Sequence, residues 1–186
     1  VSSYFSNKKE VKEKNQKRND DYQEYLLETG SQLSRLKAEQ KKALTYNFPS
    51  VDELVDLVES YNPRIYEKMV TNDDFLKVHL GTGTIDSSYS LRFQPTNRKE
   101  DWSRFVEKKL VQPHIKLEDA PIVLSLRDQA LGLAGVAPVL RVAVQTLLFQ
   151  IAALHSYHDV EFVTLVSQEE YENHWREWCW LPHAQM

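Results

Sequence analysis

The chain has 186 residues, of which 41% are hydrophobic and 27% are charged, and these values suit one medium-sized domain with an appendage rather than two independent cores. Its single cysteine excludes an internal disulfide framework and is compatible with a reducing cytosol. Residues 1–45 contain ten Lys and Arg against seven Asp and Glu, whereas residues 46–186 contain thirteen against twenty. The acidic body argues against a nucleic-acid surface, and the basic head fits a position beside a membrane span.

The longest apolar stretch, residues 139–154, is shorter than the ~20 residues that a bilayer span needs, and it includes Arg141 and two glutamines. We therefore predict a buried helix of a soluble domain there. The opening VSSYF contains neither Met nor a recognisable signal sequence, which favours a fragment that follows another segment of a longer protein.

Residues 8–46 are charged and free of proline, which predicts a long helical stalk. A seam of residues alternately four and three apart runs along it: Tyr22, Leu26, Thr29, Leu33, Leu36, Gln40 and Ala43. Two of these are polar, so a coiled coil and a solvated helix lying along its own domain remain equally open. Gly30 costs about 1 kcal/mol relative to Ala, and a bend or break there is open too.

The rest of the chain predicts alternating strands and helices. Ser50 and Glu53 have the spacing of a capping box, so a short helix should begin there and end before Pro63. We predict further helices at 100–112, 138–155 and 168–178, and strands at 74–80, 88–95, 121–126, 130–134 and 160–166. This order predicts an α/β fold with a mainly parallel sheet flanked by helices, in a domain 47–186 that follows a stalk 1–46.

Few residue clusters indicate chemistry by themselves. Gly81 and Gly83 could cradle an anion, but such glycines more often make a turn after a strand. Four histidines could be zinc ligands only with further nitrogen or sulfur donors, so helix-end and surface roles are favoured: His155, His158, His174 and His183. No acidic pair has a His or Ser neighbour that suggests a proton relay, and we assign no catalytic residue and no metal site. Trp175, Trp178 and Trp180 are better explained as core than as a docking patch.

Residues 131–166, LGLAGVAPVLRVAVQTLLFQIAALHSYHDVEFVTLV, resemble the FtsK/SpoIIIE ATPase core, in which a strand, a phosphate loop, a helix and a second strand follow in that order. The matching positions are Thr146, Leu147, Leu148, His155, Ser156, Asp159, Val160 and Phe162. DFLKVHLGTGT at 74–84 and WCWLPH at 178–183 are similar to the EssC/EccC/YukB ATPases of type VII secretion.

The resemblance implies an incomplete FtsK/RecA-like P-loop NTPase topology in the first cytosolic module of a membrane-anchored motor, on the cytoplasmic side of the cell membrane. In that family the module continues past the position of Met186 with further strands, one of which carries the acidic Walker B residue. The implied partners are neighbouring ATPase domains, other membrane components of the secretion machine including ubiquitin-like domains, and further copies in a homo-oligomer. Nucleic acid is not among them.

The phosphate loop departs from the family pattern G-x-x-x-x-G-K-[ST]. Gly135 matches the first glycine, but Leu140 replaces the second, Arg141 takes the lysine position and Val142 lacks the hydroxyl that ligates Mg²⁺, while Pro138 removes a backbone donor. We therefore predict a non-catalytic coupling or regulatory domain without a cofactor. The alternative is a weakly active ATPase module that binds Mg-ATP through Gly135 and Arg141, because an arginine can still pair with phosphate. A third possibility, a free-standing cytosolic interaction protein, is disfavoured by the VSSYF start.

Overall fold

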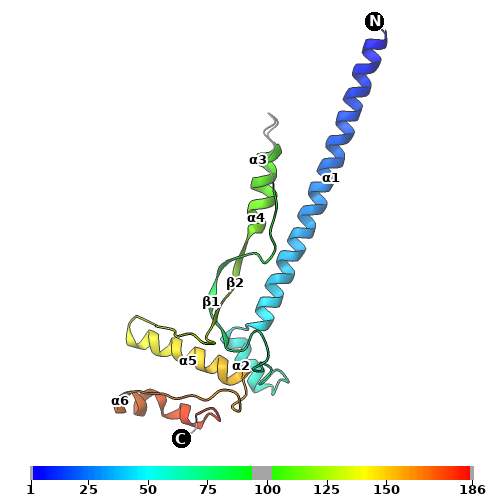
Figure 1. Cartoon of the computed structure of the whole chain (residues 1–186). Coiled ribbons are helices and arrows are strands. Elements are labelled where there is room, and N and C mark those ends of the chain that lie inside the picture. The colour runs from blue at the N-terminus through cyan, green and yellow to red at the C-terminus, as the bar shows by residue number, and fades with distance from the viewer. Residues whose placement is uncertain (1, 94–101, 185–186) are drawn as a thin grey trace. The chain divides into compact units, whose positions relative to one another are not determined.

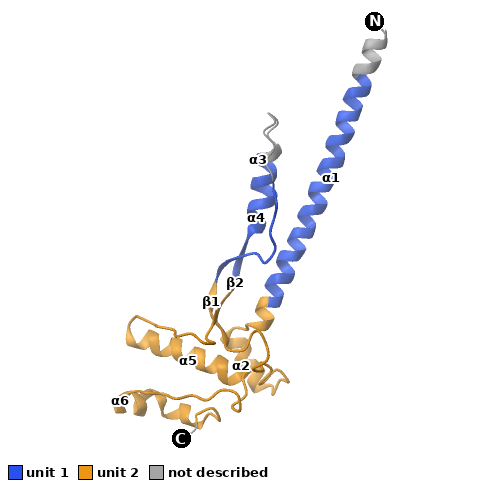
Figure 2. Ribbon diagram, viewed as in Figure 1, with its two compact units in different colours: residues 1–43, 83–120 blue, residues 44–82, 121–186 orange. Residues whose placement is uncertain are grey.

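The computed structural model describes residues 2–93 and 102–184, with side chains from 9 to 93 and from 104 to 184. The described chain forms two compact units (Figure 2). Unit 1 contains Val1–Ala43 and Gly83–Ala120, and unit 2 contains Leu44–Thr82 and Pro121–Met186. Each unit is thus built from two stretches of sequence, and the division into a stalk 1–46 and a domain 47–186 stays a prediction.

A single helix of 46 residues, α1 (Ser2–Asn47), opens the chain (Figure 1). This confirms the predicted stalk helix, which Glu, Lys, Gln and Leu favour through their high helix propensity. Gly30 neither bends nor breaks it. A Cβ atom added at Gly30 would lie 3.0 Å from Cδ1 of Leu110, so the glycine lets a second helical segment approach closely.

That second segment consists of α3 (Trp102–Val106), a π-helical stretch (Glu107–Val111) and α4 (Gln112–Ile115), as predicted for 100–112 within the described residues. It is tied to α1 by a hydrogen bond from Lys37 Nζ to the Pro113 carbonyl at 2.8 Å and by a 3.2 Å contact between Ser34 Oγ and His114 Nε2. Leu33 of the predicted seam is buried in this unit, whereas Leu36 is exposed. A largely apolar groove of about 610 Å³ remains between the two helical segments.

The sheet has two strands, β1 (Lys77–Asp86) and β2 (Lys116–Ser125), rather than the predicted parallel set. They run antiparallel, because one end pairs Ser87 N–H with the Ile115 carbonyl and the other pairs Leu126 N–H with the Leu76 carbonyl. The predicted turn at Gly81 and Gly83 is wrong, since both lie inside β1. Gly81 has φ +154°, which only glycine adopts without strain.

The predicted strands 130–134 and 160–166 are not strands in the described chain. Of the predicted strand 88–95, residues 88–93 do not form a strand, and residues 94–95 lie outside the described residues. Residues 160–166 have apolar side chains typical of a strand, yet Val163 is 81% and Leu165 93% exposed. A strand is stable only when a neighbour takes up its backbone donors and acceptors. Phe162 N–H binds the His183 carbonyl at 2.8 Å, and no ladder forms along the rest of this stretch within the described residues.

Unit 2 is organised around α2 (Val51–Glu59) and α5 (Ala137–Leu154). The predicted capping box is present: the Ser50 hydroxyl accepts from Glu53 N–H at 3.3 Å, and the Glu53 carboxylate accepts from Ser50 N–H at 2.7 Å. The buried core combines both helices and consists of Leu54, Leu57, Ala153 and Leu154, with Ile65 and Phe149 packed against it. The chain ends in α6 (Gln168–Glu170), a π-helical turn (Tyr171–Trp175) and a 3₁₀ turn (Arg176–Trp180), as predicted for 168–178.

By length and composition alone, α5 could cross a membrane: it has 18 residues and a mean hydropathy of 1.6. The core helix of a globular domain has the same properties. Residues 150–154 of α5 are buried in unit 2, whereas Val139 and Val142 near its beginning are more than 60% exposed. The prediction of a buried helix therefore holds for its last turns only.

Candidate functional site: a degenerate phosphate loop and a buried polar junction

The predicted phosphate loop lies before and within the first turns of α5. Val136 is the N-cap residue and has no side-chain hydrogen bond, and Pro138 follows within the first turn. The N–H groups of Val139 and Leu140 both bind the Val136 carbonyl, at 3.0 and 3.1 Å. A Cβ atom added at Gly135 would meet the Leu140 side chain at 3.5 Å. Two of the donors that a phosphate would need are therefore engaged, and a leucine side chain lies beside the glycine.

Arg141, the second candidate ligand, is bound to a carboxylate. Its Nη2 donates to Glu170 Oε1 at 2.8 Å and its Nε donates to Oε2 at 3.2 Å, which is the bidentate geometry of strong Arg–carboxylate pairs. Hydrogen bonding by Arg141 holds the pKa of the Glu170 carboxyl below its usual value. Gly135 and Arg141 both lie in unit 2, at the start of α5, and the guanidinium group contacts Glu170 of α6.

The other candidates are scattered. His155 ends α5 as its C-cap residue, as expected, but it and His183 are only 1% exposed, so a surface position is wrong for these two. His158 and His174 are exposed. The Cys179 thiol donates to the Tyr171 hydroxyl at 3.6 Å. Among the residues whose side chains are described, no three His, Cys, Asp or Glu lie close enough to hold a metal ion. Trp175 is buried as expected, but Trp180 is 87% exposed.

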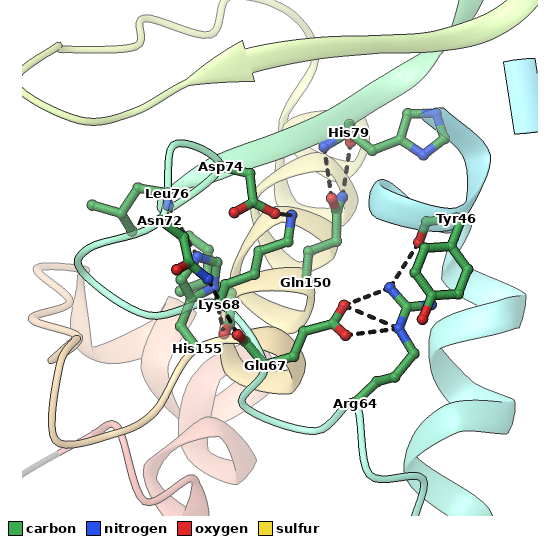
Figure 3. Close-up of polar contacts among 11 residues, drawn as sticks. Tyr46, Arg64, Glu67, Lys68, Asn72, Asp74, Leu76, His79, Gln150 and His155 are labelled. Atoms are coloured by element: carbon green, nitrogen blue, oxygen red, sulfur yellow. Dashed lines mark hydrogen bonds and ion pairs between the residues drawn. The ribbon is translucent and has the colours of Figure 1, made fainter. Parts of the chain in front are cut away.

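A cluster that sequence reasoning missed lies between α2, the start of β1 and the end of α5 (Figure 3). We call it the junction; its members are Arg64, Glu67, Lys68, Asp74, His79, Gln150 and His155. Lys68 is its centre and is 1% exposed. Its backbone N–H binds the Leu154 carbonyl at 2.9 Å, and it forms an isolated parallel bridge with His155.

The Lys68 ammonium group has few partners. Asp74 Oδ2 lies 3.5 Å from Nζ, and the Phe48 ring centroid lies 4.3 Å away in cation–π geometry. Apart from this long ion pair with Asp74, Nζ has no hydrogen-bond partner among the described side chains and backbone. Burial lowers the pKa of Lys68, and the nearby Asp74 carboxylate opposes that shift.

His155 joins α5 to the start of β1. Its Nε2 accepts from the Leu76 N–H at 3.0 Å, and Nδ1 lies 3.2 Å from the Ile151 carbonyl. The Leu76 N–H can only donate, so Nε2 carries no proton, and Nδ1–H donates to the Ile151 carbonyl. Burial, opposed by the Ile151 hydrogen bond and reinforced by the Lys68 charge, lowers the pKa of His155 to about 4. The imidazole is therefore neutral at neutral pH.

Gln150 makes a second connection between the same elements. Its amide oxygen accepts from His79 N–H and its amide nitrogen donates to the His79 carbonyl, both at 2.8 Å. The side chain is 5% exposed. A side chain of α5 thus binds the backbone of β1 as a neighbouring strand would.

Arg64 and His79 bind the end of α1 and the residues after it. Arg64 Nη2 donates to the Tyr46 carbonyl at 2.7 Å, and its guanidinium carbon lies 3.9 Å from the Tyr46 ring centroid. Arg64 Nε also lies 3.0 and 2.9 Å from the two Glu67 oxygens, and this pairing raises the pKa of Arg64. His79 Nδ1 lies 3.3 Å from the Pro49 carbonyl. The junction contains no nucleophile paired with a base, and its geometry suits holding segments together.

No protein-family model matches the chain. Curated proteins do: the type VII secretion system protein EssC of Staphylococcus aureus strains MSSA476 and NCTC 8325 is 32% identical across 98% of the chain. The ESX secretion system protein YukB of Bacillus subtilis strain 168 is 31% identical over the same share. The chain spans 12% of the length of each of these relatives.

The chain is therefore a relative of bacterial secretion-system proteins. More narrowly, nearly all of it is homologous to one segment of the larger EssC/YukB proteins of type VII secretion, which confirms the resemblance to those proteins noted from the sequence.

Proposed function

We propose that the chain is a non-catalytic coupling or regulatory domain of a membrane-anchored type VII protein-secretion motor, on the cytoplasmic side of the membrane. The names of its relatives support a role in that machinery. Its partners are then neighbouring domains of the longer protein and other components of the machine, with ubiquitin-like domains and further copies of the same chain as candidates.

The pairing of Arg141 with Glu170 carries the non-catalytic part of this proposal. The one cation at the lysine position of the loop is engaged by a carboxylate at 2.8 and 3.2 Å. The N–H groups of Val139 and Leu140 are engaged as well, and Pro138 has none. Each lost charge-assisted hydrogen bond is worth ~1.5–3 kcal/mol, so the loss of two or three would weaken a micromolar site by several powers of ten.

The junction supports the coupling part. Through Arg64 and Lys68 it holds the residues at and just after the end of α1, and through Gln150 and His155 it holds the end of α5. The last turns of α5 are thus joined by polar contacts to the end of the long helix. A domain that transmits movement requires such a connection more than it requires a ligand pocket.

Calorimetric titration of the 186-residue chain with Mg-ATP tests this function. We expect no measurable binding at millimolar ligand for the natural chain or for Arg141→Ala. Glu170→Gln is the sharper variant, because it releases the guanidinium group while leaving it in place. We expect no binding there either, since Leu140 and Pro138 remain.

Saturable micromolar binding that Arg141→Ala abolishes would overturn the proposal and support the weakly active ATPase module. Binding that appears only in Glu170→Gln would also count against it, because the Arg141–Glu170 ion pair would then be what prevents an otherwise functional site from binding nucleotide.

A further inference from the structure

The side chain of His183 is buried among three aromatic rings. It is 1% exposed. Its ring stacks on Phe162, with the centroids 5.1 Å apart and the planes inclined by 21°. Tyr66 and Tyr157 meet it edge to face, with centroids at 5.9 and 6.3 Å. Such contacts contribute beyond the burial of apolar area, so the imidazole is held firmly in an aromatic cage.

Two hydrogen bonds fasten the same residue to the end of α5 and to the segment that follows it. Nε2 of His183 lies 2.8 Å from the His155 carbonyl, and because a carbonyl only accepts, Nε2 carries the proton. The His183 carbonyl in turn accepts from the Phe162 N–H at 2.8 Å. We call residues 181–184 the strap, since they cross from one of these segments to the other.

The residue that the strap binds also holds the junction together. The His155 carbonyl receives the His183 N–H, while its imidazole accepts from the Leu76 N–H at 3.0 Å. The carbonyls of the two residues before His155 accept from the N–H groups of Lys68 and Tyr66, at 2.9 and 3.1 Å respectively. A displacement of the strap therefore acts directly on the contacts between the end of α5, residues 66–68 and the start of β1.

The closed junction has unfavourable features that opening would relieve. Tyr66 and Leu76 have φ of +63° and +56°, a left-handed conformation that large side chains adopt only where surrounding contacts impose it. Nδ1 of His183 and Nζ of Lys68 are buried without a hydrogen-bond partner among the described residues, apart from the long ion pair with Asp74. Such atoms regain hydrogen bonds when water reaches them. The junction should therefore open at a smaller cost than the packed core of α2 and α5.

We propose that the strap is a releasable closure of the junction. With His183 in its cage, the end of α5, residues 66–68 and the start of β1 are held together; when the strap lifts, they separate while α2 and α5 stay packed on each other. The device goes beyond the coupling function, because opening is a property of the 186-residue chain and needs neither nucleotide nor partner. It gives the WLPH stretch at 180–183 a physical role.

Native-state hydrogen exchange of the 186-residue chain, read by NMR at increasing urea below the unfolding transition, tests the order of events. We expect the amides of Tyr66, Lys68 and Leu76 to share one opening free energy. It should be lower than that of the Phe149 amide inside α5 and depend less on urea, because less surface is exposed. The Phe162 amide, which the strap holds, should be protected no more than those three.

Two results would overturn the proposal. Greater protection at Phe162 than at Lys68 and Leu76 would mean that the junction opens under a closed strap. A single opening free energy for Lys68, Leu76 and Phe149 would mean that the junction opens only when the whole unit unfolds. Both results are obtained with the natural chain, so the test does not depend on a variant that folds.

His183→Ala removes both the ring and the donor of the strap. We expect protection at Lys68 and Leu76 to fall at least about tenfold relative to Phe149. The matched control His174→Ala removes an exposed imidazole and should change these protection factors by less than about twofold. An equal fall at Phe149 would show that His183 only stabilises the fold, and would refute the strap.

Acetylation of lysine side chains, followed by mass spectrometry, gives a second measurement in the same variants. The Lys68 ammonium group is buried, whereas Lys108 is exposed and serves as an internal reference. In the natural chain we expect Lys68 to react at least about tenfold more slowly than Lys108. His183→Ala should speed the reaction of Lys68 and leave Lys108 unchanged. Equal rates at Lys68 in the natural chain and in His183→Ala would contradict the proposal.

Discussion

His155 makes the stability of unit 2 depend on pH below neutrality. The imidazole is 1% exposed and must be neutral to accept the Leu76 N–H. Its pKa is about 4 in the folded chain against 6.5 for an ordinary histidine. Between these values the unfolded chain binds a proton that the folded chain does not. The stability contributed by His155 is therefore fully present above pH 6.5 and is lost as the pH falls toward 4.

The two pKa values set the magnitude. At pH 5 the free energy of unfolding should be about 2 kcal/mol lower than at pH 8 through His155 alone, and below pH 4 the loss should approach about 3 kcal/mol. Urea unfolding followed by tryptophan fluorescence at pH 8, 6, 5 and about 4 measures this dependence. Other groups titrate in the same range, so the informative quantity is the difference between variants.

His155→Gln should be less stable at pH 8, because it loses buried contacts, but it should lose about 2 kcal/mol less than the natural chain on going to pH 5. His158→Gln, which removes an exposed imidazole three residues away, should keep the acid loss of the natural chain. If the natural chain and His155→Gln lose stability in parallel, the neutral, buried state of His155 is refuted.

Four further substitutions test the packing by urea unfolding. Gly30→Ala should stabilise α1 by about 1 kcal/mol, because the Leu110 methyl group at 3.0 Å borders an open groove and can move aside; a loss of stability would show that it cannot. Lys68→Met should change the free energy of unfolding by less than about 1 kcal/mol, whereas Asp74→Asn should lower it by about 2 kcal/mol, because it leaves a buried ammonium group unpaired. A larger loss for Lys68→Met than for Asp74→Asn would contradict this. Leu54→Ala should cost about 3 kcal/mol, and a cost under about 1 kcal/mol would mean that the core collapses onto the cavity.

Features set by neighbouring residues in sequence were predictable. The capping box of Ser50 and Glu53 needs only two residues three apart, and it forms as predicted. The helix α1 likewise follows from the local propensities of its residues. The prediction for Gly30 left a bend open because a sequence does not show that Leu110, 80 positions later, approaches that helix.

Strand pairing could not be derived in the same way. Residues 160–166 have the side chains of a buried strand, but pairing depends on a neighbour, and within the described residues only β1 and β2 pair in a sheet. The junction was missed for a related reason. Lysine side chains are usually exposed to solvent. Nothing near Lys68 in the sequence indicates that Asp74, Phe48 and the end of α5 enclose it.

The pairing of Gln150 with His79 fixes the register between a helix and a strand. A glutamine side chain presents an amide N–H and a carbonyl oxygen side by side, nearly as a peptide group does, and here the oxygen accepts from His79 N–H while the nitrogen donates to the His79 carbonyl. If α5 slid by one residue along β1, Phe149 or Ile151 would face the His79 backbone and leave a donor and an acceptor unpaired, which costs several kcal/mol in a buried site. The contact therefore opposes sliding between the two elements. The end of α5 and the start of β1 keep this register unless both hydrogen bonds of Gln150 break.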